Sequence, residues 1–124
     1  TPMITKHFDA EALSADMFDS RTALRSVLET FSPWLVEVRA QLHAAIGTGE
    51  AEALGRIVHR MRGALAQLRA VRAVGLVRTL DAQCRQDSAL AIPPDHPALA
   101  ALDAELDALA SEVTDYLATL RDGA

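Results

Sequence analysis

One histidine lies among basic and small residues in the middle of the chain. In the segment Val58-His59-Arg60-Met61-Arg62-Gly63-Ala64, Arg62 follows His59 by three residues and Gly63 follows it by four. Residues three and four apart are neighbours on a helix, so both would lie beside the imidazole. An exposed imidazole has a lone pair available for nucleophilic attack. The segment therefore predicts an imidazole that another molecule can approach closely.

A helical wheel separates His59 from the apolar side of its own segment. With Leu54 at zero and about 100° per residue, the buried face lies within about 60° of zero, and its members are Leu54, Ile57, Val58, Met61, Leu65 and Leu68. His59 falls near about 140°, Arg62 near about 80° and Gly63 near about 180°. Glycine inside a helix costs roughly 1 kcal/mol relative to alanine, which calls for a compensating role. Two explanations for Gly63 remain: another molecule approaches His59 closely, or another helix packs against the glycine. The wheel favours the first, because Gly63 points away from the apolar stripe.

Charge is distributed unevenly along the chain. The net charge of −5 argues against non-specific nucleic-acid binding. From Ala53 to Leu80 there is no Asp or Glu, and the same stretch holds Arg56, Arg60, Arg62, Arg69, Arg72 and Arg78. The last third is acidic, with Asp103, Glu105, Asp107, Glu112 and Asp115. The middle of the chain therefore presents either a local positive field for a partner or a solvated Arg-rich face.

The composition predicts an all-α fold in a single domain over residues 1–124. Half of the residues are apolar and only 4% are aromatic, so Ala, Leu and Val must fill the core. The alternation of β-branched residues that marks strands is missing. No stretch approaches the roughly 20 apolar residues that span a bilayer, and the first residues have no signal-peptide pattern. The first residue is Thr1 rather than Met, so we expect a trimmed chain or a piece of a longer one.

The apolar spacing predicts five helices, at about residues 9–18, 21–46, 50–68, 72–87 and 96–121. We expect an up-and-down antiparallel four-helix bundle with a short extra N-terminal helix. Pro33 predicts a kink or a break at Phe31-Ser32, and Pro93-Pro94 and Pro97 predict a loop from Ser88 to Pro97. The expected helix caps are Asp9, Asp19-Ser20 and Asp95 or His96, and Gly47-Thr48-Gly49 is expected to end the second helix.

With these elements in place, the segment around His59 resembles the motif of the histidine-containing phosphotransfer (HPt) family, His-x-x-Lys-Gly. Residues 44–54 resemble the helix connection that the family has before the motif, and residues 76–81 resemble the helix that follows it. The resemblance spans about Phe8 to Leu120. By this resemblance His59 is the phosphoacceptor. Arg62 takes the place of the Lys that steadies the phosphoryl oxygens, and Gly63 leaves room for the partner.

The resemblance implies a phosphate carrier of two-component signalling rather than an enzyme. Such a domain accepts a phosphoryl group from a receiver-domain aspartate and passes it to another receiver, which supplies the Asp and the Mg²⁺. We therefore expect no cofactor and no metal in this chain, no membrane contact, a monomer, and a cytoplasmic location, alone or as part of a hybrid sensor kinase. The expected partner surface comprises Gly55, Arg56, Arg60, Ala66 and Gln67.

Three departures from the family pattern keep other interpretations open. Arg62 replaces the commoner Lys, Ala64 stands where Ser or Thr is frequent, and Arg69 stands where a Gly usually separates two helices. A degenerate adaptor that docks a partner without carrying phosphate is one alternative, and a plain structural bundle is another.

The remaining candidate residues point to structure rather than chemistry. His7, His43 and His96 share no metal-ligand spacing and are expected at the surface or in caps. The single Cys84 continues an apolar stripe and is expected in the core. Trp34 is expected in the core or as a partly covered anchor, with a partner surface as the alternative.

Overall fold

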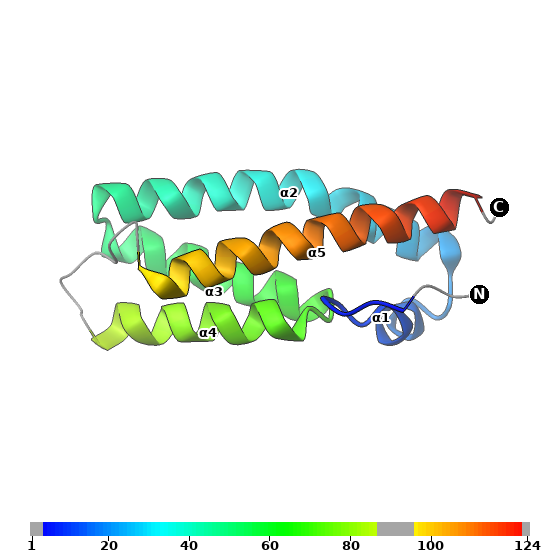
Figure 1. The fold of residues 1–124 in the computed structure, drawn as a ribbon, viewed down its shortest axis with the longest axis horizontal. Coiled ribbons are helices and arrows are strands. Elements are labelled where there is room, and N and C mark those ends of the chain that lie inside the picture. Colours follow the sequence, from blue (N-terminus) through cyan, green and yellow to red (C-terminus); the bar gives the residue numbers. More distant parts are fainter. Residues whose placement is uncertain (1–3, 87–95, 123–124) are drawn as a thin grey trace.

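The computed structural model describes residues 4–86 and 96–122, and these residues form a helical bundle. The helices are α1 (Ala10–Asp16), α2 (Arg21–Thr48), α3 (Ala51–Gln67), α4 (Val71–Gln86) and α5 (Pro97–Asp122). The four long helices lie side by side, and the short α1 sits at one end (Figure 1). Helix α3 packs against α2 and α4, and α5 packs against the same two helices, so α3 and α5 occupy opposite corners. The prediction of an all-α fold is confirmed.

The core consists of the apolar stripes that the spacing predicted. On α5 the apolar side chains at three- and four-residue spacing are buried, and the stripe comprises Leu99, Leu102, Leu106, Leu109, Val113 and Leu117. Burial of one such side chain stabilises a fold by about 1.5–3 kcal/mol. No polar or charged residue of the described part is buried. Charged groups are therefore confined to the surface, where the candidate site lies.

The predicted caps define the helix ends. Asp9 accepts a hydrogen bond from the backbone N–H of Ala12 at 3.0 Å, and Ser20 caps α2 in the same way. Gly49 ends α2 with a left-handed φ of 70°, which glycine adopts without steric cost. His96 Nδ1 lies 3.0 Å from the N–H of Ala98 and caps α5.

Several predicted boundaries require small corrections. Helix α1 ends at Asp16, because Phe18 and Asp19 have left-handed φ values of 55° and 56°. Pro97, where the expected loop and the expected last helix overlap, is the first residue of α5, a position that proline favours. Residues 87–95 of that loop and the Cys84 side chain lie outside the described part.

Pro33 does not interrupt α2, so of the kink or break that was expected at Phe31-Ser32 the break is wrong. The helix runs from Arg21 to Thr48 with Pro33 inside it. Pro33 is exposed, whereas Phe31 and Leu35 on either side are buried. The continuous apolar stripe therefore holds the two halves of α2 on one core.

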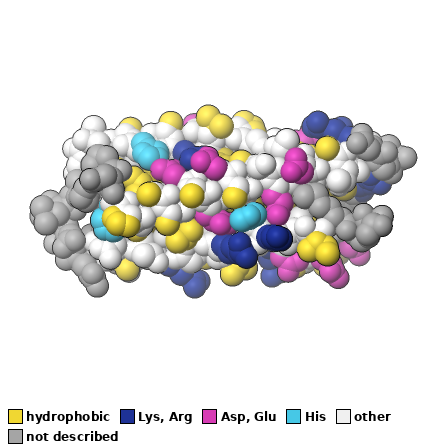
Figure 2. All heavy atoms as spheres, in the orientation of Figure 1, with side chains coloured by type: hydrophobic (Ala, Val, Ile, Leu, Met, Phe, Trp, Pro, Cys, Tyr) yellow, Lys and Arg dark blue, Asp and Glu magenta, His cyan; other side chains and the backbone are white. Residues whose placement is uncertain are grey.

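The N-terminal segment is fastened to α5. The Glu112 carboxylate accepts hydrogen bonds from the backbone N–H groups of Lys6, His7 and Phe8 at 2.7–3.3 Å. The Phe8 and Tyr116 rings meet edge to face at 5.7 Å. Figure 2 shows Asp and Glu side chains gathered along α5 on this face of the molecule. None of the helices in the described residues is long and apolar enough to cross a membrane.

Candidate functional site

Helix α3 turns His59 toward solvent. Its neighbours Val58, Met61 and Leu65 are 1% exposed or less and hold one side of the helix on the core. His59 and Arg60 are exposed because they lie on the opposite side of the same turn. Since α3 and α5 occupy opposite corners, the acidic face of α5 lies away from this imidazole.

His59 differs from the other three histidines in having no partner among the residues that the structure describes. His7 Nδ1 lies 2.8 Å from Glu105, and His43 Nε2 lies 3.0 Å from Asp103. His96 caps α5, as described above. No hydrogen bond or ion pair to the His59 ring occurs within residues 4–86 and 96–122. Its ring nitrogens are therefore available to an incoming group.

Gly63 leaves open space beside His59. A Cβ built at Gly63 would meet no atom within 4 Å, and the residue is exposed. Close packing of another helix of this chain therefore does not explain the glycine, and that alternative is wrong. A surface kept free of side chains one turn from the imidazole would admit a second molecule.

A shallow hollow of about 560 Å³ surrounds His59. It is lined by Glu52, Gly55, Arg56, His59 and Arg60. Three of the five residues expected to form a partner surface, namely Gly55, Arg56 and Arg60, thus lie together with the imidazole. A Cβ at Gly55 would also meet nothing within 4 Å.

The basic residues near His59 differ in how they are held. Arg60 donates a hydrogen bond to Gln41 on α2 at 2.5 Å, so its side chain leans toward α2. Arg62 is half-buried and does not line the hollow. Neither Arg56 nor Arg62 has an acidic partner among the described residues. Two uncompensated guanidinium groups therefore lie on the same helix as His59.

Arg69 does not join this basic group, contrary to the sequence interpretation. Its guanidinium donates two hydrogen bonds of 2.8 Å to the two oxygens of Asp16 on α1. The hydrogen bonds from Arg69 lower the pKa of Asp16, and the same contact raises the pKa of Arg69. The backbone carbonyl of Arg69 also accepts the N–H of Asp9 at 3.0 Å. Arg69 thus connects α1 to the turn between α3 and α4, with a left-handed φ of 66°.

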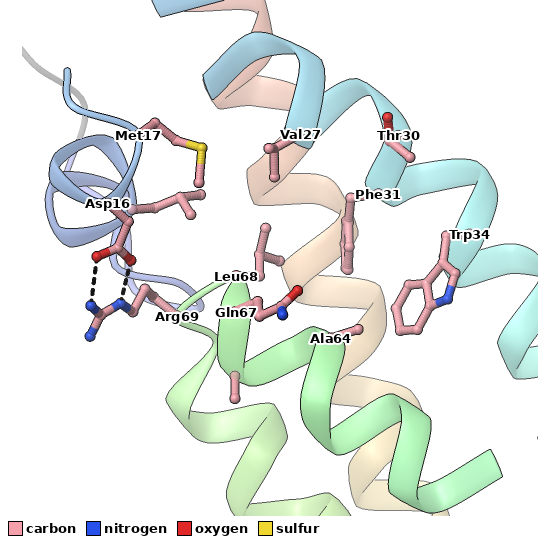
Figure 3. A pocket seen from close by; sticks show the side chains of 12 residues that line it. Asp16, Met17, Val27, Thr30, Phe31, Trp34, Ala64, Gln67, Leu68 and Arg69 are labelled. Carbon is pink, nitrogen blue, oxygen red and sulfur yellow. Dashed lines mark hydrogen bonds and ion pairs between the residues drawn. The ribbon is translucent and has the colours of Figure 1, made fainter. Parts of the chain in front are cut away.

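Ala66 and Gln67 line a second hollow, at the C-terminal end of α3. This groove of about 780 Å³ lies between α1, α2 and α3, and Figure 3 shows Val27, Phe31 and Trp34 facing it from α2. Trp34 is half-buried and packs against Phe31 at a ring distance of 5.8 Å. The groove, Gln41 and the Asp16 partner of Arg69 were not predicted as site features. The signals in the sequence were Arg69 at a usual glycine position, Trp34 as an alternative partner surface, and the expected partner residues Ala66 and Gln67.

Comparison with protein families identifies the family of the chain. The family model for the Hpt domain matches residues 26–112, which is more than half of the chain. The chain belongs to the Hpt domain family. Searches among curated proteins and among solved structures gave no significant match.

The family places the domain in phosphorelays as a phosphotransfer carrier of two-component signalling. Hpt domains are phosphate-carrying modules that interact with receiver domains. Among the described residues, no three His, Cys, Asp or Glu side chains gather as a metal site. His59 is the candidate for the carrier residue because its ring is exposed and without a partner.

Proposed function

We propose that His59 accepts a phosphoryl group from a receiver aspartate and passes it to the aspartate of another receiver. The observation that carries the proposal is the free, exposed imidazole of His59 next to the open surface at Gly63. The other three histidines are engaged in contacts with Glu105, Asp103 and the N-terminus of α5.

The transfer is an exchange of one bond to phosphorus for another. A lone pair on a His59 ring nitrogen attacks the phosphorus of the receiver's aspartyl phosphate. The bond from phosphorus to the aspartate oxygen breaks, its electron pair stays on that carboxylate, and a P–N bond forms. In the second transfer an aspartate of the next receiver attacks the same phosphorus and the imidazole leaves. No external oxidant, reductant or nucleotide enters either step.

Each neighbouring residue has a part in this proposal. Arg62, one turn from His59 and without an acidic partner, binds the phosphoryl oxygens, and a guanidinium can do so with two hydrogen bonds. Gly63 leaves space for the receiver. Gly55, Arg56 and Arg60 contact the docked partner around the imidazole. The receiver contributes the acidic pocket and its Mg²⁺, and this chain contributes no metal ligand.

The positive field should speed the encounter with an acidic receiver. Residues 53–80 contain no acid, and Arg56 and Arg62 are not neutralised by an ion pair within the described residues. We expect the association rate with a cognate receiver to fall as salt rises. An association rate that is equal at low and high salt would contradict this part of the proposal.

Phosphate transfer to a histidine variant tests the proposal. The chain is incubated with a panel of ³²P-labelled receiver domains, in parallel with His59→Gln and with His43→Gln as a control at another exposed histidine. We expect acid-labile, base-stable label on the native chain and on His43→Gln, and none on His59→Gln. If the native chain binds a receiver but takes no label, the adaptor interpretation replaces the carrier.

We propose that the domain is a monomer, because one histidine and one docking face suffice for the transfer. We also propose that it works in the cytoplasm.

A further inference from the structure

Arg60 is held next to His59 by a neutral side chain. Its guanidinium donates a hydrogen bond of 2.5 Å to the side-chain oxygen of Gln41 on α2. An amide oxygen can orient a guanidinium without neutralising its charge. Other arginines of the described part are held by carboxylates instead, in the pairs Arg25–Glu29, Arg39–Asp103, Arg39–Asp107, Arg69–Asp16 and Arg121–Glu29. Arg60 therefore combines a held position with a charge that no ion pair offsets among the described residues.

A second contact sets the direction of the Gln41 amide. Its nitrogen donates to the carboxylate of Glu37, one turn earlier on α2, at 3.5 Å. The amide oxygen is thereby left for Arg60, because a reversed amide would set N–H groups against a guanidinium that has donors only. Glu37 forms no ion pair with Arg60 in residues 4–86 and 96–122. Gln41 thus accepts from Arg60 in place of that carboxylate.

The hollow around His59 keeps a net positive charge. Arg56 and Arg60 line it together with a single acid, Glu52. Arg60 lies about 100° around α3 from His59, and consecutive helix residues do not face each other. Its guanidinium is therefore directed to the α2 edge of the hollow rather than to a phosphoryl group on the imidazole. The N–H donors that Gln41 does not use suit a carboxylate on a molecule that covers His59.

We propose that Gln41 is a positioning residue for docking: it holds the Arg60 guanidinium, still charged, at the α2 edge of the hollow, where Arg60 pairs with a carboxylate of the receiver. This inference rests on the proposed function, since the partner is the receiver that exchanges phosphate with His59. Gln41 acts through Arg60 and not on the imidazole.

Removal of the acceptor tests the position of Arg60. Gln41→Met keeps the length of the side chain but loses the amide oxygen. With a ³²P-labelled receiver we expect the concentration for half-maximal transfer to rise about threefold, because docking must then order a long side chain. The maximal transfer rate should not change, nor should labelling of His59 by phosphoramidate, a small donor that does not dock. In an Arg60→Ala background, Gln41→Met should have no further effect.

A charged acceptor tests the charge of Arg60. Gln41→Glu still accepts from the guanidinium but neutralises it. Association with the receiver should slow about threefold at low salt and should depend less on salt. Ala40→Glu is the matched control, because Ala40 is exposed on α2 and lies about 100° around the helix from Gln41. It adds the same charge away from Arg60 and should associate at close to the native rate.

Several outcomes would overturn the role of Gln41. These are a native half-maximal concentration in Gln41→Met, the same loss when Arg60 is replaced by alanine, or an equal loss with phosphoramidate. Equal association rates for Gln41→Glu and Ala40→Glu would overturn the part played by the charge of Arg60. A native chain that takes no label from either donor would instead overturn the proposed function, and this inference with it.

Discussion

Gly63 offers a quantitative test of the open surface beside His59. Substitution by alanine removes the helix-propensity cost of glycine, which is about 0.8–1.0 kcal/mol. Apart from the two neighbouring residues and the adjoining backbone of α3, no described atom lies within 4 Å of the added Cβ, so no steric clash offsets this gain. With an unfolding entropy of about 2.1 cal/mol/K per residue, the gain corresponds to an increase in Tm of about 4 °C. Gly63→Ala should therefore be more stable than the native chain.

Gly75 provides the matched control. It lies inside α4, is exposed, and would also meet nothing within 4 Å as alanine. Urea unfolding and thermal melts followed by circular dichroism should give similar gains for Gly63→Ala and Gly75→Ala. A lower stability for Gly63→Ala alone would refute the reasoning, because some group would then have to pack against Gly63 in solution.

The same pair of positions separates stability from docking. Gly63→Leu adds bulk beside His59 and should lower transfer from a receiver at least about fivefold, since overpacking a fitted surface costs about 1–3 kcal/mol. Gly75→Leu should transfer at the native rate. Both variants should remain folded. Native transfer in Gly63→Leu would show that Gly63 does not serve to admit the partner.

Three further predictions concern phosphate binding, pH and the core. Arg62→Ala should lower the equilibrium phosphorylation of His59 about tenfold, by loss of a charge-assisted hydrogen bond. Arg62→Lys should retain most of the phosphorylation. Equal labelling of Arg62→Ala and the native chain would show that Arg62 does not bind the phosphoryl group. The folded-state pKa of Asp16 is lowered by Arg69, so this pair adds stability above the unfolded pKa of about 3.9. The stability difference between the native chain and Asp16→Asn should therefore shrink as pH falls through that value and vanish below the lowered pKa; a difference that persists at lower pH would contradict the pair. Leu106→Ala should cost about 2–5 kcal/mol in urea unfolding, because Leu106 is 0% exposed; a cost below about 1 kcal/mol would contradict its place in the core.

The apolar pattern predicted the bundle well because burial follows helical periodicity. The seam on α5 and the stripe on α3 are buried as expected, and the wheel placed His59 and Gly63 on the solvent side. Asp9, Ser20 and Gly49 cap helices as their residue types indicate. Local rules suffice for these features because the interacting groups are close in sequence.

Contacts between residues far apart in the chain could not be predicted from the sequence. The Asp16 and Arg69 pair joins residues 53 positions apart, and nothing in either neighbourhood specifies the partner. The left-handed φ of Arg69 is likewise unexpected, because side chains other than glycine adopt it at a steric cost. Local reasoning also left a break at Pro33 open beside a kink, and α2 continues through Pro33 because the apolar stripe packs on one core. The groove at Trp34 follows from the way in which three helices meet.

The central claim is that His59, among four histidines, carries the phosphoryl group, and ¹⁵N-histidine NMR tests it most directly. The chain is labelled on its imidazole nitrogens and phosphorylated with phosphoramidate or a phosphorylated receiver, and His59→Gln assigns the signals. The account predicts that the ring nitrogens of His59 shift, while the signals of His7, His43 and His96 stay in place. A shift at one of those three histidines, or no shift at all in a folded chain, would contradict the account.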